Sequence, residues 1–168
     1  MTGVSTIVMI AYDGSEDSRR AVKYAGKFLN RADDTVQAVV VTAWESTIHQ
    51  ASRVSAMSGV MSPGGAEPDY HVVEDAQHAA ALKTNRGGVE LARAVGLTTT
   101  GELVEVASTV WAALVAAAET ANADVIVTGS RGETGLKALL HSSTSEHVLK
   151  HCKRPVLIVP SGCTDIVE

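Results

Sequence analysis

The sequence predicts an α/β protein with an open, five-stranded parallel sheet and helices on both faces. Short apolar runs rich in Val and Ile recur along the chain without alternating polar residues, which is typical of strands buried on both faces. Stretches with helical spacing separate most of these runs, and such alternation favours parallel strands joined by crossover helices. Only 4% of the residues are aromatic, so the core is expected to be aliphatic.

The first strand is expected at residues 6–12, where β-branched residues dominate. It ends at the turn Asp13-Gly14-Ser15. Ser15 is a good N-cap, and acidic residues at the next two positions suit the positive end of a helix dipole. Apolar residues at helical spacing predict the buried face of that helix: Ala21, Val22, Ala25, Phe28 and Leu29.

A second buried strand is expected at residues 36–44. The following stretch, from about 45 to 69, is rich in Gly, Pro, Ser and Met and predicts a mobile loop or lid, with disorder or a partner contact favoured over direct catalysis. Residues 70–95 have the apolar spacing of a long helix. The pair Gly87-Gly88 inside it predicts a kink or a division into two helices, and Gly96 predicts the C-cap.

The rest of the chain continues the alternation. A third strand is expected at residues 101–106, followed by a helix that Ser108 caps. The fourth strand, at 125–128, ends at Gly129; a helix is expected at 143–150 and a fifth strand at 155–160. Neither a linker nor an internal repeat is visible, so residues 1–168 are predicted to form a single domain.

Composition excludes several classes of protein. The formal net charge of −5 argues against nucleic-acid binding, which needs a basic face. The first residues lack the features of a signal peptide, and the apolar run at 7–11 is far too short to span a membrane. The two cysteines, Cys152 and Cys163, have no metal-binding spacing, and His147 and His151 lack a third ligand. These features predict a cytoplasmic protein with reduced thiols and no metal site.

Two strand ends carry unusual residues. In open parallel sheets, ligands bind beyond the carboxyl ends of the strands, where the strand order switches. Here the candidates are residues 11–15, after the first strand, and 128–132, after the fourth. The second segment leads to four hydroxyl residues at 142–145, before the expected helix. Glycine turns and a helix N-terminus suit a phosphate chain, with Arg131 or Lys137 adding charge. The same residues also suit plain turns and a helix cap, and both interpretations stay open.

Two stronger phosphate motifs are absent from the sequence. No Gly-x4-Gly-Lys-Ser/Thr occurs, which excludes a P-loop. No Gly-x-Gly-x-x-Gly follows the first strand, which disfavours a dinucleotide site of the Rossmann type.

The chain resembles the universal stress protein family along most of its length. Residues 7–15 match the opening strand and Asp-Gly-Ser turn of that family, and 154–160 match its final Arg-Pro-Val-Leu-Ile-Val-Pro. Gly129, Gly132 and Ser143 fit the family's frame of Gly, two residues, Gly, nine residues, then Gly and Ser or Thr. The third glycine of that frame is replaced by Ser142. The resemblance implies an adenine nucleotide alpha hydrolase-like, Rossmann-like fold.

The resemblance also implies a function, namely stress-response regulation through an adenine nucleotide. ATP, with or without magnesium, is the implied ligand. Asp13 would contact its adenine or ribose end, Val41 would line the base pocket, and the glycine and hydroxyl residues would surround ribose and phosphates. The residues expected at this cleft are Ala11, Tyr12, Asp13, Ser15, Val41, Gly129, Arg131, Gly132, Ser142, Ser143, Thr144 and Ser145.

The implied partners are a second copy of the chain and a protein that the sequence does not identify. Family members commonly form homodimers through the last strand, here Val156, Leu157, Ile158 and Val159, and an unpaired apolar edge would be a liability. Two alternatives stay open. A nucleotide-free dimeric interaction module is favoured by Ser142, because serine suits positive φ or close phosphate approach less well than glycine. An ATP-cleaving enzyme would need more catalytic groups than the sequence shows, so at most slow hydrolysis is expected.

Overall fold

The computed structural model describes residues 5–29, 36–46, 70–129, 152–160 and 163. The elements are β1 (Thr6–Ala11), α1 (Glu16–Leu29), β2 (Val36–Trp44), α3 (Tyr70–Ala94), β3 (Thr98–Glu105), α4 (Val110–Thr120), β4 (Val125–Gly129) and β5 (Val156–Val159). The loop predicted at 45–69, from residue 47 onward, and the helix predicted at 143–150 lie outside the described residues.

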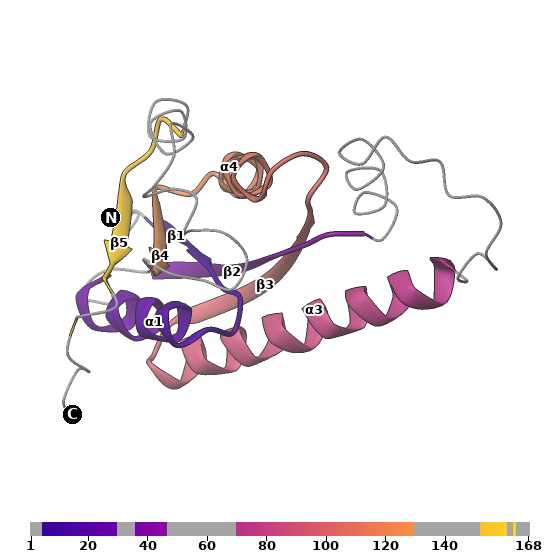
Figure 1. Cartoon of the computed structure of the whole chain (residues 1–168). Coiled ribbons are helices and arrows are strands. Elements are labelled where there is room, and N and C mark those ends of the chain that lie inside the picture. Colours follow the sequence, from indigo (N-terminus) through magenta and orange to yellow (C-terminus); the bar gives the residue numbers. More distant parts are fainter. Residues whose placement is uncertain (1–4, 30–35, 47–69, 130–151, 161–162, 164–168) are drawn as a thin grey trace, which may run out of the picture.

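The five strands form one parallel sheet in the order β3-β2-β1-β4-β5. Helices α1 and α3 cover one face of this sheet, and α4 lies on the other (Figure 1). The predicted fold class is therefore confirmed. No helix in the described part of the chain is both long and apolar enough to cross a membrane.

The core consists of two aliphatic layers, one on each side of the sheet. Along β1, Val8 and Ile10 pack toward α1 and α3, whereas Met9 and Ala11 pack toward α4 and its Trp111. This alternation is the period of two that a strand imposes on its side chains. Because both faces are buried, the strand sequence is apolar throughout, as expected for a parallel sheet.

Two predicted boundaries were wrong. The third strand begins at Thr98 rather than at residue 101, because Thr98 already pairs with Gln37 of β2 and threonine suits an extended strand. The residue that caps α4 is Thr109 and not Ser108. Thr109 has the extended φ of −135°, and its hydroxyl accepts a hydrogen bond from the amide of Ala112.

Helix α3 runs without interruption through Gly87 and Gly88, so the chain does not form two helices there. The glycine at 88 serves close packing, since an added Cβ would lie 2.6 Å from Cδ1 of Tyr12. The helix ends at Ala94, and Gly96 caps it as predicted, with φ of +88° and its N–H donating to the carbonyl oxygen of Arg93.

Candidate functional site

The strand order places a switch point between β1 and β4. The chain passes from β1 through β2 to β3 on one side, and β4 then joins β1 on the other side. At the carboxyl ends of these two strands the connections diverge, and this is where open α/β sheets bind ligands. Ile10 pairs with Val127, so Tyr12, just beyond β1, lies level with Gly129 at the end of β4.

The turn after β1 holds the carboxylate of Asp13 in a fixed position. Oδ1 of Asp13 accepts a hydrogen bond of 3.0 Å from the amide of Ser15. Gly14 between them has φ of +82°, which glycine adopts without strain. This is the local hydrogen bonding by which aspartate stabilises turns. Asp13 is half-buried, so a carboxylate stands at the edge of the sheet where the sequence predicted a ligand contact.

Ser15 acts as the predicted cap of α1. Its hydroxyl accepts the amide of Ser18 at 3.2 Å, and its carbonyl oxygen accepts the hydroxyl of Ser18 at 2.9 Å. The first turn of α1 carries Glu16 and Asp17, whose carboxylates already complement the helix dipole. Asp17 pairs with Arg20 at 2.9 Å and Glu16 with Arg19 at 3.7 Å, and the predicted contact of Ser15 with ribose and phosphates stays a prediction.

Ala11, Tyr12 and Val41 lie beneath the turn, with their side chains in the core. Tyr12 is 6% exposed and Val41 is fully buried. The amide of Tyr12 donates to the carbonyl oxygen of Val41 at 2.9 Å, and the carbonyl oxygen of Tyr12 accepts the hydroxyl of Thr42 at 2.8 Å. The predicted role of Val41 in a base pocket stays a prediction.

Gly129 is required by packing. A Cβ added there would lie 2.6 Å from the carbonyl carbon and oxygen of Asp17, so β4 and the first turn of α1 approach as closely as a glycine permits. Its predicted contact with phosphate stays a prediction. The remaining predicted site residues lie outside the described residues: Arg131, Gly132, Ser142, Ser143, Thr144 and Ser145.

Sequence reasoning missed Asn85, which α3 places against the middle of β3 and the middle and carboxyl half of β2. Its Nδ2 donates to the carbonyl oxygens of Val40 at 2.9 Å and Glu102 at 3.0 Å, and to Oγ1 of Thr42 at 3.2 Å. Asn85 is 4% exposed. The available signal was an asparagine, a weak helix former, at an inward position of a predicted helix.

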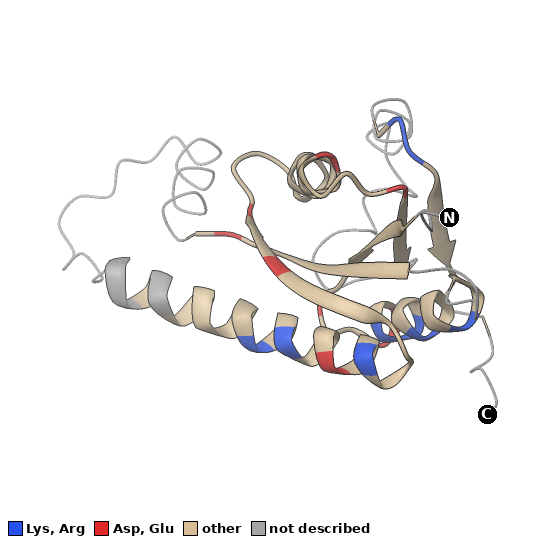
Figure 2. Ribbon diagram, turned by 180° about the vertical axis from the view of Figure 1, so that it is seen from behind, with Lys and Arg blue, Asp and Glu red and all other residues tan. Residues whose placement is uncertain are grey.

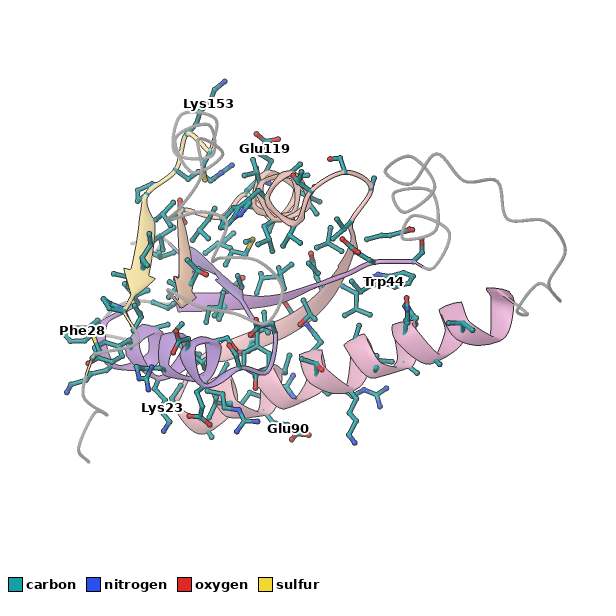
Figure 3. All side chains as sticks on the ribbon, viewed as in Figure 1. Lys23, Phe28, Trp44, Glu90, Glu119 and Lys153 are labelled. Carbon is teal, nitrogen blue, oxygen red and sulfur yellow. The ribbon has the colours of Figure 1, made fainter. Side chains whose placement is uncertain are left out.

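Trp44, at the end of β2, contacts α3 nearer to the N-terminus of that helix than Asn85 does. Its ring meets the ring of His78 edge-on, with centroids 5.1 Å apart and planes at 79°. Trp44 is labelled in Figure 3, between the end of β2 and α3. Trp111 is buried in the α4 layer, so one of the two tryptophans is a core residue and the other joins β2 to α3.

Charged residues of both signs occur on the helices, whereas those of β2 and β3 are acidic. In Figure 2 basic residues colour much of α1 and α3, with an acidic residue among them on α3, and acidic residues also colour α4, β3 and the end of β2. The acidic residues of these strands are Glu45, just after β2, Glu102, in the middle of β3, and Glu105, at its end. Among the described residues, no group of three or more His, Cys, Asp or Glu could hold a metal ion.

Comparison with known proteins identifies the family. The universal stress protein family model matches residues 5–160. Universal stress protein MJ0531 of Methanocaldococcus jannaschii is 29% identical over 152 residues, which cover 90% of this chain and 80% of that protein. The solved structure of the hypothetical protein MJ0577 has a TM-score of 0.67 at 19% identity and covers 95% of this chain and 98% of its own.

Two further solved structures contain adenine nucleotides. A universal stress protein in complex with cAMP has a TM-score of 0.58 at 24% identity and covers 92% of this chain and 96% of its own. The universal stress protein from Archaeoglobus fulgidus in complex with dAMP has a TM-score of 0.55 at 20% identity, covering 92% and 97%. These likenesses show the same fold, and the family model spans nearly the whole sequence. The chain therefore belongs to the universal stress protein family.

Proposed function

We propose that this chain binds an adenine nucleotide at the carboxyl ends of β1 and β4 and acts as a stress-response regulator. The observation that carries the proposal is the half-buried Asp13, fixed by Ser15 at the switch point of the sheet. Two structures of the same fold, solved with cAMP and dAMP, support the class of ligand.

ATP, with or without magnesium, is the specific ligand that we propose. cAMP and dAMP share the adenine base and one phosphate, so these are the minimum groups that the site would recognise. In our proposal Asp13 contacts the adenine or ribose end. Arg131 and Lys137, with the hydroxyl residues at 142–145, offer the donors that further phosphates need.

We propose that the bound nucleotide serves regulation rather than being turned over as a substrate. We also propose that the protein is cytoplasmic. The hydroxyl of Ser15 is occupied as the cap of α1, which does not favour a nucleophilic role. Cys152 packs in the α4 layer and Cys163 against the opposite layer, so the sheet separates the two thiols, and we propose that both stay reduced in the cytoplasm. Slow hydrolysis would reset a nucleotide-dependent signal.

Calorimetric titration of the full chain tests the proposal. We expect saturable binding of AMP, cAMP and ATP, with magnesium affecting only ATP. GMP should bind about tenfold more weakly or worse, because an unsatisfied polar group in a base pocket costs about 1–3 kcal/mol. Failure of every adenine nucleotide to bind would support the alternative that Ser142 favours, a nucleotide-free interaction module.

A matched pair of variants then tests the role of Asp13. Asp13→Asn keeps an oxygen that can accept the amide of Ser15 but removes the charge, and it should weaken binding about tenfold. Glu16→Gln removes the same charge from an exposed carboxylate three residues further on and should bind within about twofold of wild type, because an exposed charge contributes little. Equal affinities for the two variants would remove Asp13 from the site.

We also propose that the chain forms a homodimer through β5. The two edges of the sheet differ: β3 carries exposed glutamates, which oppose edge pairing, whereas β5 is a short run of Val, Leu and Ile. Ile158 of β5 is half-buried and belongs to neither core layer in the described residues. Such a side chain is available to a second copy.

Ile158→Lys should therefore convert a dimer to a monomer in sedimentation equilibrium, because a charge on an edge strand opposes pairing. The control is Thr100→Lys, which places the same charge at an exposed position of β3, and it should leave the dimer intact. A monomeric wild type, or dissociation by both variants alike, would contradict pairing through β5.

A further inference from the structure

A chain of buried hydrogen bonds joins α3 to the turn that holds Asp13. Asn85 and Thr42 are both 4% exposed, and Nδ2 of Asn85 donates to Oγ1 of Thr42 at 3.2 Å. The hydroxyl of Thr42 donates in turn to the carbonyl oxygen of Tyr12 at 2.8 Å. The contacts connect residues 43 and 30 positions apart, so only the tertiary fold brings them together.

The direction of these bonds is fixed by the number of hydrogens. The hydroxyl oxygen of Thr42 accepts a hydrogen from the amide of Asn85. Its own single hydrogen is therefore donated to the carbonyl oxygen of Tyr12. The carbonyl of Tyr12 belongs to the planar peptide group that leads into Asp13. Holding that oxygen therefore fixes the orientation of the backbone immediately before the carboxylate.

The ring of Tyr12 is held by the same helix. An added Cβ at Gly88 would lie 2.6 Å from Cδ1 of Tyr12, so the ring lies directly against the helix backbone. Gly88 is three residues after Asn85, which places both on one face of α3. The helix thus restrains Tyr12 twice, through its ring and, by way of Thr42, through its carbonyl.

A glycine in the neighbouring strand leaves space for the side chain of Asn85. Gly101 of β3 lies opposite its amide, and a Cβ added to Gly101 would collide with Oδ1 of Asn85. Glycine weakens a strand, and it often occurs within a strand where another group approaches the backbone closely. The amide nitrogen of Asn85 has two hydrogens for three acceptors, so at least one hydrogen is shared between two of them. Together these bonds join α3 to β2 and β3.

We propose that Asn85 and Thr42 are positioning residues of the nucleotide site, and that through them nucleotide binding is coupled to the packing of α3 on the sheet. This inference rests on the nucleotide binding proposed above. A nucleotide that contacts Asp13 restrains the peptide before it, and the restraint passes through Thr42 to Asn85 and the helix. By thermodynamic reciprocity, a partner that binds α3 and stabilises its packing on the sheet strengthens nucleotide binding by the same factor.

Thr42→Val tests the coupling, because valine has nearly the shape of threonine but neither donates nor accepts. We expect it to weaken AMP binding about three- to tenfold, which corresponds to the typical net contribution of one hydrogen bond. Thr42→Ser keeps the hydroxyl and should bind within about twofold of wild type. AMP should slow amide exchange in α3 around residues 82–92 in wild type and Thr42→Ser, but not in Thr42→Val saturated with AMP.

Thr99→Val separates positioning from a merely structural role. Thr99 is also buried, and its hydroxyl donates to the carbonyl oxygen of Leu97 at 3.0 Å, at the amino end of β3. Its loss should lower stability about as much as Thr42→Val does, yet leave AMP affinity and the slowed exchange in α3 unchanged. If Thr42→Val does not fold, Thr42→Cys, with a weaker donor of similar size, takes its place with the same expectations.

The outcomes distinguish this inference from the proposed function. A wild type that binds no adenine nucleotide overturns both. A wild type that binds AMP overturns the coupling alone if Thr42→Val binds equally well. The coupling is also overturned if α3 is protected by AMP in Thr42→Val as it is in wild type.

Discussion

Adjacent glycines in α3 have different roles. A Cβ at Gly87 would meet nothing within 4 Å, whereas a Cβ at Gly88 would meet Tyr12 and Val40 at less than 3.0 Å. The first glycine only costs helix stability, and the second allows the helix to lie close to the sheet. The helix therefore forms despite both residues, because packing of its buried face outweighs their propensity.

Opposite effects are expected from alanine at these two positions. Gly87→Ala should raise the free energy of unfolding by about 0.5–1 kcal/mol, since alanine is the better helix former. Gly88→Ala should lower it by about 1–3 kcal/mol, because the added methyl group forces Tyr12 or the helix to move. Urea denaturation measures both, and a change of the same sign in the two variants would contradict the packing role of Gly88.

A second prediction concerns the stability of a Gly129 variant, which must be known before its nucleotide binding is interpreted. Gly129→Ala should lower the free energy of unfolding by about 1–3 kcal/mol in the absence of any nucleotide, because the new Cβ meets the backbone of Asp17. Thermal unfolding without ligand measures this effect. A variant as stable as wild type would assign the glycine to ligand approach instead of packing.

At the scale of the elements, the N-cap of α4 shows where local patterns mislead. Ser108 and Thr109 are adjacent hydroxyl residues, and either could cap a helix. The structure selects Thr109, because its hydroxyl reaches the amide of Ala112 while its backbone stays extended. Thr109→Ala should therefore cost about 1 kcal/mol of stability, and Ser108→Ala less than about 0.5 kcal/mol, both measured by urea denaturation. Equal losses would mean that the cap is shared.

Most elements could be predicted from the sequence because their signals are local. The strands β1, β2, β4 and β5 appear as apolar runs, and the strand limits agree with the prediction to within one residue at each end. The start of β3 was missed because Thr98 and Thr99 are not apolar, and only pairing with β2 identifies them as strand. Capping by Ser15 was predictable, since cap and amide are three residues apart.

At the scale of the whole molecule, the site is divided between local and tertiary features. Asp13 could be found from the sequence, because a polar turn after an apolar strand is a local pattern. The bonds from Asn85 to Thr42 and onward to Tyr12 could not be found, because they depend on the position of α3 against β2 and β3. The close packing of Gly129 on Asp17 likewise follows from β4 lying beside β1 and under α1.

The most direct test of a nucleotide site at the switch point is an NMR titration of isotope-labelled full chain with AMP. We predict saturable shifts in the amides of Tyr12, Asp13, Gly14 and Ser15, together with that of Gly129. The amides of Leu97 and Asp124, at the opposite ends of β3 and β4, should stay unchanged. Saturable shifts confined to those opposite ends, or no saturable shifts at all, would contradict a nucleotide site between β1 and β4.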